Sequence, residues 1–360
     1  MASALLRILN VPSEGLTLEF ICRPIGCILL QPVITAAGLI ASIYYPDVAQ
    51  SLLPRSLQQA ATSFRITSSL ACLVSAGLLF RLNRWLSNRA LNHFTNTTTW
   101  DWEKEVALVT GGSSGIGALI VEKLAGQNIT VVSIDIKPPS EPLPANVQYY
   151  QVDITSFQGI KEVSKQIKEK FGNPSILVNN AGIATSSPIV QKSEQDVRRV
   201  FDVNIISHFA LLKEFLPSMI ERNHGHIVTV ASMASFMVHA GNVDYACSKV
   251  AALAFHEGLN QELQHIYKAT RIRTTVVHPS WVRTPLVDTV LSKGHITGLV
   301  LDATTVADAI VAQILKGESA QLILPSRLSF MAGIRGYPSW LQEWVRSSDG
   351  GSLVFMCPQG

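Results

Sequence analysis

Tyr245 and Lys249 are the two residues of this chain whose types and spacing best suit proton transfer. They stand four residues apart in the stretch DYACSKVAALAF (244–255), so on a helix both side chains would share one face. An unperturbed tyrosine, with a pKa of about 10, exchanges protons poorly near neutral pH, but a neighbouring ammonium group favours the phenolate. The same spacing also fits two amphipathic side chains on one helical face, so the surrounding elements must decide between these interpretations.

Seven short apolar runs alternate with helical stretches from Val106 onward. The runs are rich in Val and Ile and mostly lack polar alternation, which is typical of parallel strands covered on both faces. They lie at 106–110, 129–135, 147–153, 175–180, 226–232, 272–279 and 321–325, with helices expected at 116–127, 156–171, 194–222, 244–267 and 304–316. The predicted fold class is α/β, a doubly wound (Rossmann) seven-stranded parallel sheet.

A glycine-rich turn, TGGSSGIG (110–117), follows the first run and opens a helix. Its glycines let the backbone turn sharply and approach an anion, while the helix N-terminus directs free N–H groups at a pyrophosphate. The strict GxGxxG fingerprint is absent, because Gly115-x-Gly117 is followed by Ala118, Leu119 and Ile120. Its position after a strand predicts a dinucleotide site, and a merely structural turn is the alternative.

Asp135 ends the second run, twenty residues beyond Gly115. A carboxylate there would accept hydrogen bonds from the adenosine ribose hydroxyls and repel a 2′-phosphate. Lys137 lies two residues later, and its cation tempers this preference. We therefore expect NAD(P) as cofactor, with NAD(H) favoured over NADP(H).

With these motifs the chain resembles the short-chain dehydrogenase/reductase family over about residues 103–325. TGGSSGIG is similar to the TGxxxGxG loop of that family, Asn179-Asn180-Ala181-Gly182 to its NNAG motif, and HPSWVRTP (278–285) to its PGxxxTP segment, with Ser280 for the usual glycine. Asp153 resembles the aspartate that contacts adenine after the third strand. The cofactor-binding residues expected from the motifs and this resemblance are Thr110, Gly111, Ser113, Ser114, Gly115, Ile116, Gly117, Asp135, Asp153, Ile154, Asn180, Ala181, Gly182, Tyr245, Lys249, Pro279, Val282 and Thr284.

The resemblance also implies a catalytic tetrad of Asn204, Ser232, Tyr245 and Lys249 for reversible hydride transfer at a carbinol carbon. Tyr245 would exchange the proton, and Lys249 would lower its pKa and bind the nicotinamide ribose. Ser232 would orient the substrate oxygen. Asn204 would hold a water that relays protons from Lys249 to solvent.

Residues 1–99 differ from the rest of the chain and are expected to anchor it in a membrane. The run at 24–46 contains no charged residue, and as a helix it would cross a bilayer core of about 30 Å. A second run at 66–80, bounded by Arg65 and Arg81, is short for a span. A hairpin of both is favoured modestly. The alternatives are a single span, a helix lying in the membrane interface, a signal peptide and a buried core helix.

Charge and cysteine content limit the other classes of function. The chain carries 29 basic and 26 acidic residues; residues 1–99 hold seven arginines, no lysine and three acids, which leaves residues 100–360 near neutral. A near-neutral domain of this kind lacks the excess positive charge that nucleic-acid binding requires. The five cysteines are irregularly spaced, and His208, His239 and His278 lack a metal-ligand pattern, so free thiols and no metal are expected.

The hydrophobic N-terminal region (1–99), the catalytic domain (100–325) and an apolar extension (326–360) are similar to a branch that contains retinol dehydrogenases and 17-beta-hydroxysteroid dehydrogenases. That resemblance implies a lipophilic alcohol, ketone or aldehyde of retinoid, steroid or long-chain type. It also implies a lipid bilayer or lipid-droplet surface as partner, at the endoplasmic reticulum, with the catalytic domain in the cytosol. A ketoreductase of fatty-acid elongation or specialised metabolism and a non-catalytic lipid-surface scaffold are the alternatives.

The predicted substrate pocket has apolar walls and a mobile lid. Residues 281–302 should form the lid, and Phe236, Met237 and Val238 should add apolar lining. Core packing explains the same residues nearly as well. The tail at 328–345 is expected to lie in the membrane interface near the pocket mouth, or else to pack on the domain or form a homodimer contact.

Overall fold

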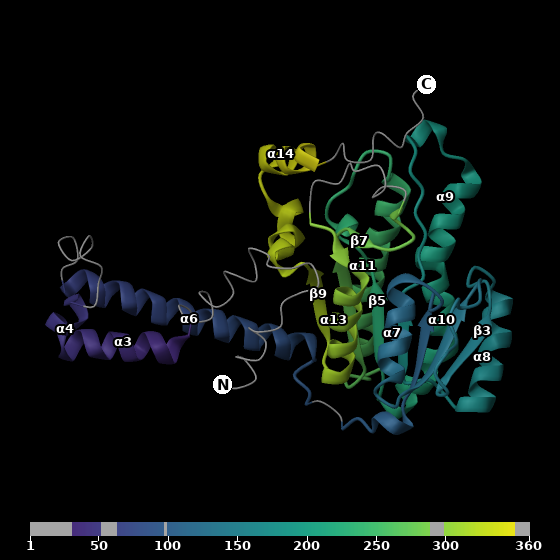
Figure 1. Cartoon of the computed structure of the whole chain (residues 1–360), viewed down its shortest axis with the longest axis horizontal. Coiled ribbons are helices and arrows are strands. Elements are labelled where there is room, and N and C mark those ends of the chain that lie inside the picture. The colour runs from purple at the N-terminus through teal and green to yellow at the C-terminus, as the bar shows by residue number, and fades with distance from the viewer. Residues whose placement is uncertain (1–30, 52–62, 97–98, 289–298, 350–360) are drawn as a thin grey trace. The chain divides into compact units, whose positions relative to one another are not determined.

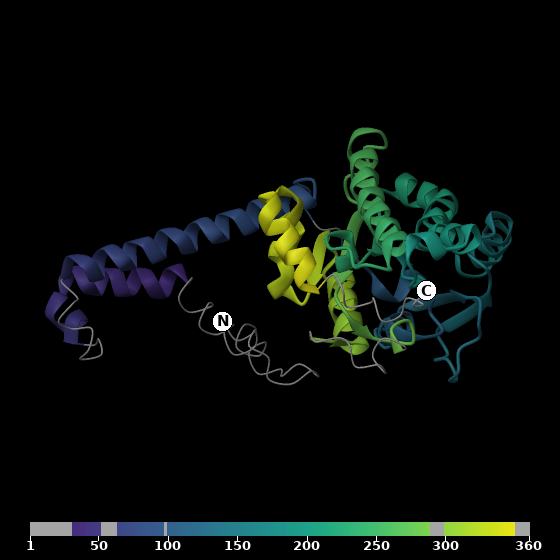
Figure 2. The same ribbon diagram turned by 90° about the horizontal axis from the view of Figure 1, so that it is seen from above.

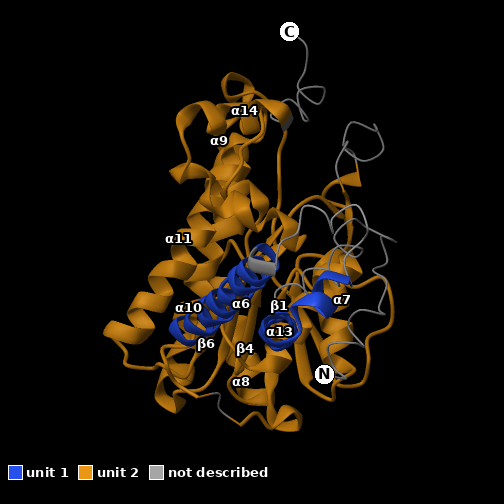
Figure 3. Cartoon of the chain, turned by 90° about the vertical axis from the view of Figure 1, so that its left-hand side faces the viewer, with its two compact units in different colours: residues 1–90 blue, residues 91–360 orange. Residues whose placement is uncertain are grey.

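The computed structural model describes residues 31–51, 63–96, 99–288 and 299–349. The chain divides into two compact units, Met1–Ala90 and Leu91–Gly360 (Figure 3). The second unit thus begins nine residues before the boundary expected at residue 100. Each unit is described by itself below.

The first unit contains α3 (Pro32–Tyr44), α4 (Pro46–Ser51) and nearly all of α6 (Ser63–Leu91). Helices α3 and α6 lie side by side (Figure 2): the Ser42 and Thr67 hydroxyl oxygens are 3.3 Å apart. Within the described residues, only the stretch Arg65–Leu91 is long and apolar enough to cross a membrane. The apolar run at 66–80 lies within α6, a helix of 29 residues that also includes Arg81 and Arg84. Residues 24–30 of the first predicted run lie outside the described residues.

The second unit is built on seven parallel strands in the order β3-β2-β1-β4-β5-β6-β9 (Figure 1). The predicted doubly wound sheet is therefore confirmed. The order reverses between β1 and β4, and ligands of such sheets bind at the carboxyl ends of the strands at this point. The strands are β1 (Val106–Thr110), β2 (Thr130–Asp135), β3 (Val147–Gln151), β4 (Ile176–Asn179), β5 (His226–Val230), β6 (Arg273–Pro279) and β9 (Ala320–Leu324).

Helices cover both faces of this sheet, as the Val- and Ile-rich strands require. On β1, Leu108 packs toward one face, whereas Ala107 and Val109 pack toward the other, and all three side chains are fully buried. The first face is covered by α8 (Phe157–Phe171), α10 (Ser207–Arg222) and α11 (Val243–His265), and the second by α7 (Gly115–Ala125) and α13 (Ala303–Lys316).

The helix predicted at 194–222 contains a local irregularity. It begins as α9 (Glu194–Phe201), widens to a π-helical turn at Asp202–Ile206, and continues as α10. A π turn inserts an extra residue per turn and often marks a functional site. Asn204 lies at the centre of this turn.

Several smaller elements complete the unit. A two-stranded sheet of β7 (Val282–Arg283) and β8 (Leu301–Asp302) lies in the predicted lid, of which residues 289–298 are outside the described residues. The tail forms a 3₁₀ helix (Ser326–Gly336) and α14 (Ser339–Asp349). Short 3₁₀ turns occur at Trp102–Lys104, Ile189–Gln191 and Met233–Ser235.

Arg273, on β6, ties the start of the second unit to the sheet. Its side chain is fully buried and donates hydrogen bonds to the Asn92 carbonyl oxygen (3.3 Å), the Thr95 hydroxyl (3.1 Å) and the Asn96 carbonyl oxygen (2.7 Å). Asn92 in turn accepts a hydrogen bond from the Ser319 amide. These contacts make residues 92–96 part of the second unit.

Candidate active site

A cavity of about 920 Å³ opens at the carboxyl ends of β1, β2 and β4, where the strand order reverses. Its walls combine the glycine-rich turn with the ends of β2 and β4 and the segment after β3. Predicted cofactor residues in the wall are Gly111, Ser114, Gly115, Ile116, Asp135, Asp153, Ile154, Asn180, Ala181, Gly182 and Thr284. The structure thus brings together residues separated by up to 173 positions in sequence.

The turn between β1 and α7 needs glycine for two different reasons. Gly111 has φ of +65°, a conformation that other residues rarely adopt. A Cβ atom on Gly117 would collide with the Gly111 carbonyl oxygen. The close packing of turn and helix leaves space for a ligand in front of the α7 N-terminus.

Asp135 lies at the rim of this cleft and is held by the glycine-rich turn. Its carboxylate accepts hydrogen bonds from the Ser113 amide (3.1 Å) and the Lys137 amide (3.3 Å). The Ser113 hydroxyl is buried and has no hydrogen-bond partner among the described residues. The carboxylate of Asp135 in the cavity wall, together with the nearby N-terminus of α7, fits a ligand that carries ribose and phosphate groups.

Thr110 lies beneath the cleft rather than in its wall. Its hydroxyl oxygen accepts hydrogen bonds from the Asn180 and Ala181 amides, both at 3.0 Å. It therefore joins the end of β1 to the NNAG segment. Ser113 and Gly117 likewise support the turn from behind the cavity wall.

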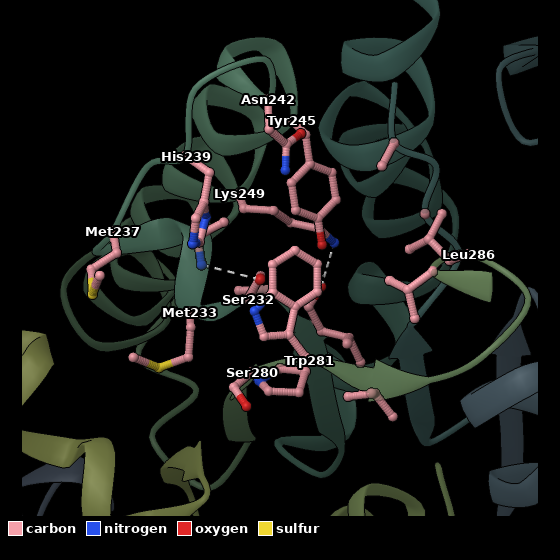
Figure 4. A pocket seen from close by; sticks show the side chains of 18 of the residues that line it. Ser232, Met233, Met237, His239, Asn242, Tyr245, Lys249, Ser280, Trp281 and Leu286 are labelled. Atoms are coloured by element: carbon pink, nitrogen blue, oxygen red, sulfur yellow. Dashed lines mark hydrogen bonds between the residues drawn. The ribbon is translucent and has the colours of Figure 1, made fainter. Parts of the chain in front are cut away.

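A second cavity, of about 430 Å³, meets the first at Ile116, Asn180, Gly182, Thr284 and Leu286. Ser232, Tyr245 and Lys249 line the second cavity, and Figure 4 shows their side chains converging. The Lys249 ammonium lies next to Gly182, which belongs to both walls. The remaining predicted cofactor residues, Pro279 and Val282, line this second cavity. Ser280, the departure from the family pattern, donates its amide hydrogen to the Leu324 carbonyl oxygen (2.8 Å).

Burial dominates the electrostatics of Tyr245 and Lys249. The Lys249 ammonium lies 5.6 Å from the centroid of the Tyr245 ring and donates to the Val230 carbonyl oxygen (2.9 Å). Burial lowers the pKa of Lys249 to about 8. Burial raises the pKa of the Tyr245 phenol, and a hydrogen bond with Ser232 acts in the opposite direction. The net direction is upward, opposite to the lowered pKa expected from the sequence.

Asn204 is fully buried in the π turn and fixes the segment after β4. Its amide oxygen accepts from the Ile183 amide, and its NH2 group donates to the Ile183 carbonyl oxygen and the Ser248 hydroxyl, all at 2.9 Å. A Cβ atom on Gly182 would lie 3.4 Å from this oxygen and 3.5 Å from the Lys249 ammonium. Asn204 and Lys249 thus approach the same point, and the water relay between them stays a prediction.

Comparison with known proteins agrees with this geometry. The family model for short chain dehydrogenases matches residues 105–294. The chain belongs to this family. Members of the short-chain dehydrogenase family use NAD(P) to oxidise CH–OH groups or reduce the corresponding carbonyls, so the chain is an oxidoreductase.

Individual relatives show which branch of the short-chain dehydrogenase family the chain resembles. The chain is 44% identical over 223 residues to dehydrogenase RED2 of Cochliobolus heterostrophus, covering 61% of this chain and 82% of the relative. It is 32% identical over 235 residues to human estradiol 17-beta-dehydrogenase 11, covering 63% and 77%. The resemblance to the 17-beta-hydroxysteroid dehydrogenase branch is confirmed. A short-chain dehydrogenase structure from Streptomyces avermitilis shares the fold, with a TM-score of 0.55 and 24% identity over 68% of this chain and 98% of that one.

Sequence reasoning missed part of the wall of the second cavity in this short-chain dehydrogenase. Residues from the tail, Leu328, Met331 and Val345, line it together with Met233. Of the three residues expected to add apolar lining, Met237 does so; Phe236 instead is buried against the His278 ring. The tail residues had only their apolar composition as a signal, because their contact with the cavity depends on the path of the chain after β9.

Proposed function

We propose that the protein is a membrane-attached oxidoreductase that interconverts a lipophilic alcohol and its ketone or aldehyde. The observation that carries this proposal is that two cavities adjoin, with Ser232, Tyr245 and Lys249 in the wall of the smaller one and Lys249 next to the shared residue Gly182. One cavity suits a dinucleotide, and the other, smaller cavity has mostly apolar walls. A substrate carbon placed at their junction would lie beside both the cofactor cleft and the phenol.

Each polar residue at the junction has a distinct role in this proposal. The bound NAD(P) supplies or accepts the hydride. Tyr245 donates its phenolic proton to the substrate oxygen during reduction and removes it during oxidation. The Ser232 hydroxyl orients that oxygen. Lys249 places a positive charge beside the phenol, and its ammonium lies close to Gly182 in the segment after β4.

The wall chemistry supports a lipophilic substrate. Three methionines, Met233, Met237 and Met331, line the second cavity with Trp281 and Leu286 (Figure 4 labels all of these except Met331). Methionine side chains adapt to irregular apolar ligands. The relation to an estradiol 17-beta-dehydrogenase also favours a steroid-like, retinoid or long-chain substrate over a small polar one.

An acyl-thioester ketoreductase is the second candidate. Arg327 lies in the wall of the same cavity, where its cation suits the anionic handle of such a thioester. A steroid or retinoid would make no use of this charge. Comparing the two substrate types in one assay separates the candidates.

Membrane attachment through the N-terminal unit is part of the proposal. Arg65–Leu91 is long enough to span a bilayer, and α6 exposes Leu78, Leu79 and Phe80. The endoplasmic reticulum or a lipid-droplet surface is the proposed location. A homodimer is also proposed, because Ile206 and Phe209 expose apolar surface on the catalytic unit. Light scattering of the solubilised protein measures its molecular mass and so tests this proposal.

Replacing Tyr245 with phenylalanine tests the proposed chemistry. Tyr245→Phe keeps the ring and removes the proton, so turnover should fall by about a thousandfold or more, within the range known for acid–base catalysis combined with substrate positioning. The assay uses membrane fractions with estradiol, retinol, a long-chain alcohol and a ketoacyl thioester, each with NAD(H) and NADP(H). NADH fluorescence should show unchanged cofactor binding. Activity equal to that of the unmodified protein would refute the mechanism.

A further inference from the structure

The segment at 183–193, which connects β4 to α9, forms part of the pocket wall and contains little regular structure. Ala184, Thr185 and Ser186 line the second cavity. Beyond Ile183, which Asn204 holds, the backbone of this segment is joined to the rest of the site by the bond from the Ser187 amide to the Gly241 carbonyl oxygen (2.9 Å). Side chains must supply most of the remaining attachment.

Three side chains of this region form a closed, buried polar cluster. The Thr185 hydroxyl donates to one carboxylate oxygen of Asp244 (2.6 Å) and accepts from the Lys192 ammonium (2.8 Å). Lys192 also pairs with the other carboxylate oxygen of Asp244 at 2.9 Å. The side chains of this ion pair are 4% and 2% exposed. Ion pairs this deeply buried depend on good geometry and on additional hydrogen bonds, which Thr185 provides.

Asp244 connects this cluster directly to the helix that carries the proposed acid. It lies in the first turn of α11, and its carboxylate accepts a hydrogen bond from the Tyr245 amide (2.9 Å). One carboxylate therefore binds the segment after β4 and the backbone of the next residue, Tyr245. Figure 4 shows Tyr245 beside Asn242 at the start of this helix, facing the cavity.

We propose that Thr185, Lys192 and Asp244 are positioning residues that hold the pocket wall at 183–193 against the first turn of α11 and thereby fix Tyr245 relative to the substrate. None of the three is assigned to the tetrad or the cofactor cleft. The proposal rests on the proposed role of Tyr245. The Thr185 hydroxyl is engaged by both partners, so it serves the cluster rather than the substrate.

Thr185 offers a matched pair of variants that separates the hydroxyl from packing. Thr185→Val keeps the shape and removes the hydroxyl, whereas Thr185→Ser keeps the hydroxyl and removes a methyl group. We expect kcat to fall at least about tenfold in Thr185→Val, since small displacements of catalytic groups cost one to two orders of magnitude, and to stay within about twofold in Thr185→Ser. The Kd for NADH should be unchanged in both, because Ile183 and the NNAG segment are held separately by Asn204 and Thr110.

A second pair of variants, at Lys192, distinguishes a positioning role from a loss of folding. Lys192→Met should lower kcat as Thr185→Val does, while Lys192→Arg, which keeps the charge, should restore much of it. Equal kcat in Thr185→Val and Thr185→Ser, or an unchanged kcat in Lys192→Met, would overturn the proposal. Loss of the fold in both Thr185→Val and Lys192→Met would assign the cluster to stability alone and would overturn it as well.

The Tyr245→Phe variant, measured in the same assay, keeps the two proposals distinguishable. Turnover retained by Tyr245→Phe would refute the proposed function. Turnover lost in Tyr245→Phe but retained in Thr185→Val would refute only the positioning role.

Discussion

Asp135 combines two tasks at the rim of the cofactor cleft. Its carboxylate holds the glycine-rich turn through the Ser113 amide, and its negative charge faces the place where a ribose would lie. The backbone amide of Lys137 donates a hydrogen bond to the same carboxylate, and Lys137 is exposed to solvent. We therefore propose that the charge of Asp135 faces the ribose of the cofactor and makes NAD(H) the preferred form.

Substitution of Asp135 should change cofactor preference. In Asp135→Ala the Kd for NADH should rise roughly ten- to a hundredfold, as expected for a lost charge-assisted hydrogen bond, whereas the Kd for NADPH should change little or fall. Asp135→Asn is the control that keeps an acceptor oxygen and removes only the charge. Fluorescence titration measures both constants, and a larger loss for NADPH than for NADH would reverse the assigned preference.

The helix α6 is the longest described element of the N-terminal unit. It presents an almost wholly exposed apolar stretch, and α3 beside it adds Ile40 and Ile43. These helices would bury that surface in lipid. The tail helix α14 also exposes aromatic surface, at Trp340 and Trp344, which is the pattern of an interfacial segment.

Removal of residues 1–90 should release the protein from membranes. The variant should move from the membrane pellet to the supernatant on fractionation, because it loses α3 and nearly all of α6. The full chain carrying Trp340→Ala and Trp344→Ala is the matched control and should stay in the pellet. If the shortened chain stays in the pellet and the control leaves it, the tail is the anchor instead.

The sequence predicts the strands and most helices well because each shows a local signal. Val- and Ile-rich runs fall within about two residues of the seven observed strands. The π turn at Asn204 has no such signal, because one additional residue in a helical turn scarcely changes the spacing of apolar side chains. The apolar run at 66–80 marks only part of α6, because Arg81 and Arg84 interrupt the run without interrupting the helix.

The candidate site divides in the same way. The glycine-rich turn and the tetrad have fixed spacings that sequence motifs record. The cluster of Thr185, Lys192 and Asp244 joins residues 59 positions apart, and no local pattern relates them. The raised pKa of Tyr245 also required the structure, since only the folded environment shows that burial outweighs the hydrogen bond with Ser232.

At the scale of the whole molecule, four buried histidines link stability to pH. Burial lowers the pKa of His208 and His226 from 6.5 to about 3, and that of His256 and His278 to about 4. Between pH 6.5 and 4 the unfolded chain therefore binds more protons than the folded chain. Stability must fall as the pH falls through this window, by at most about 1.4 kcal/mol per pH unit for each histidine.

Thermal unfolding of the full chain in detergent checks this linkage. The midpoint should be clearly lower at pH 5.5 than at pH 7.5. His226→Asn removes one of the titrating groups, so the fall should be shallower in that variant even if its midpoint at pH 7.5 is lower. A midpoint that is equal at both pH values would contradict the prediction.

The buried guanidinium of Arg273 determines where a soluble version of this enzyme can begin. Its three acceptors, on Asn92, Thr95 and Asn96, come from the few residues that follow α6. A recombinant chain starting at residue 91 keeps all three acceptors. One starting at residue 100 leaves the buried guanidinium without these acceptors, which is strongly destabilising. The cutting point for crystallisation is thus set by one side chain on β6, rather than by the last apolar residue of α6.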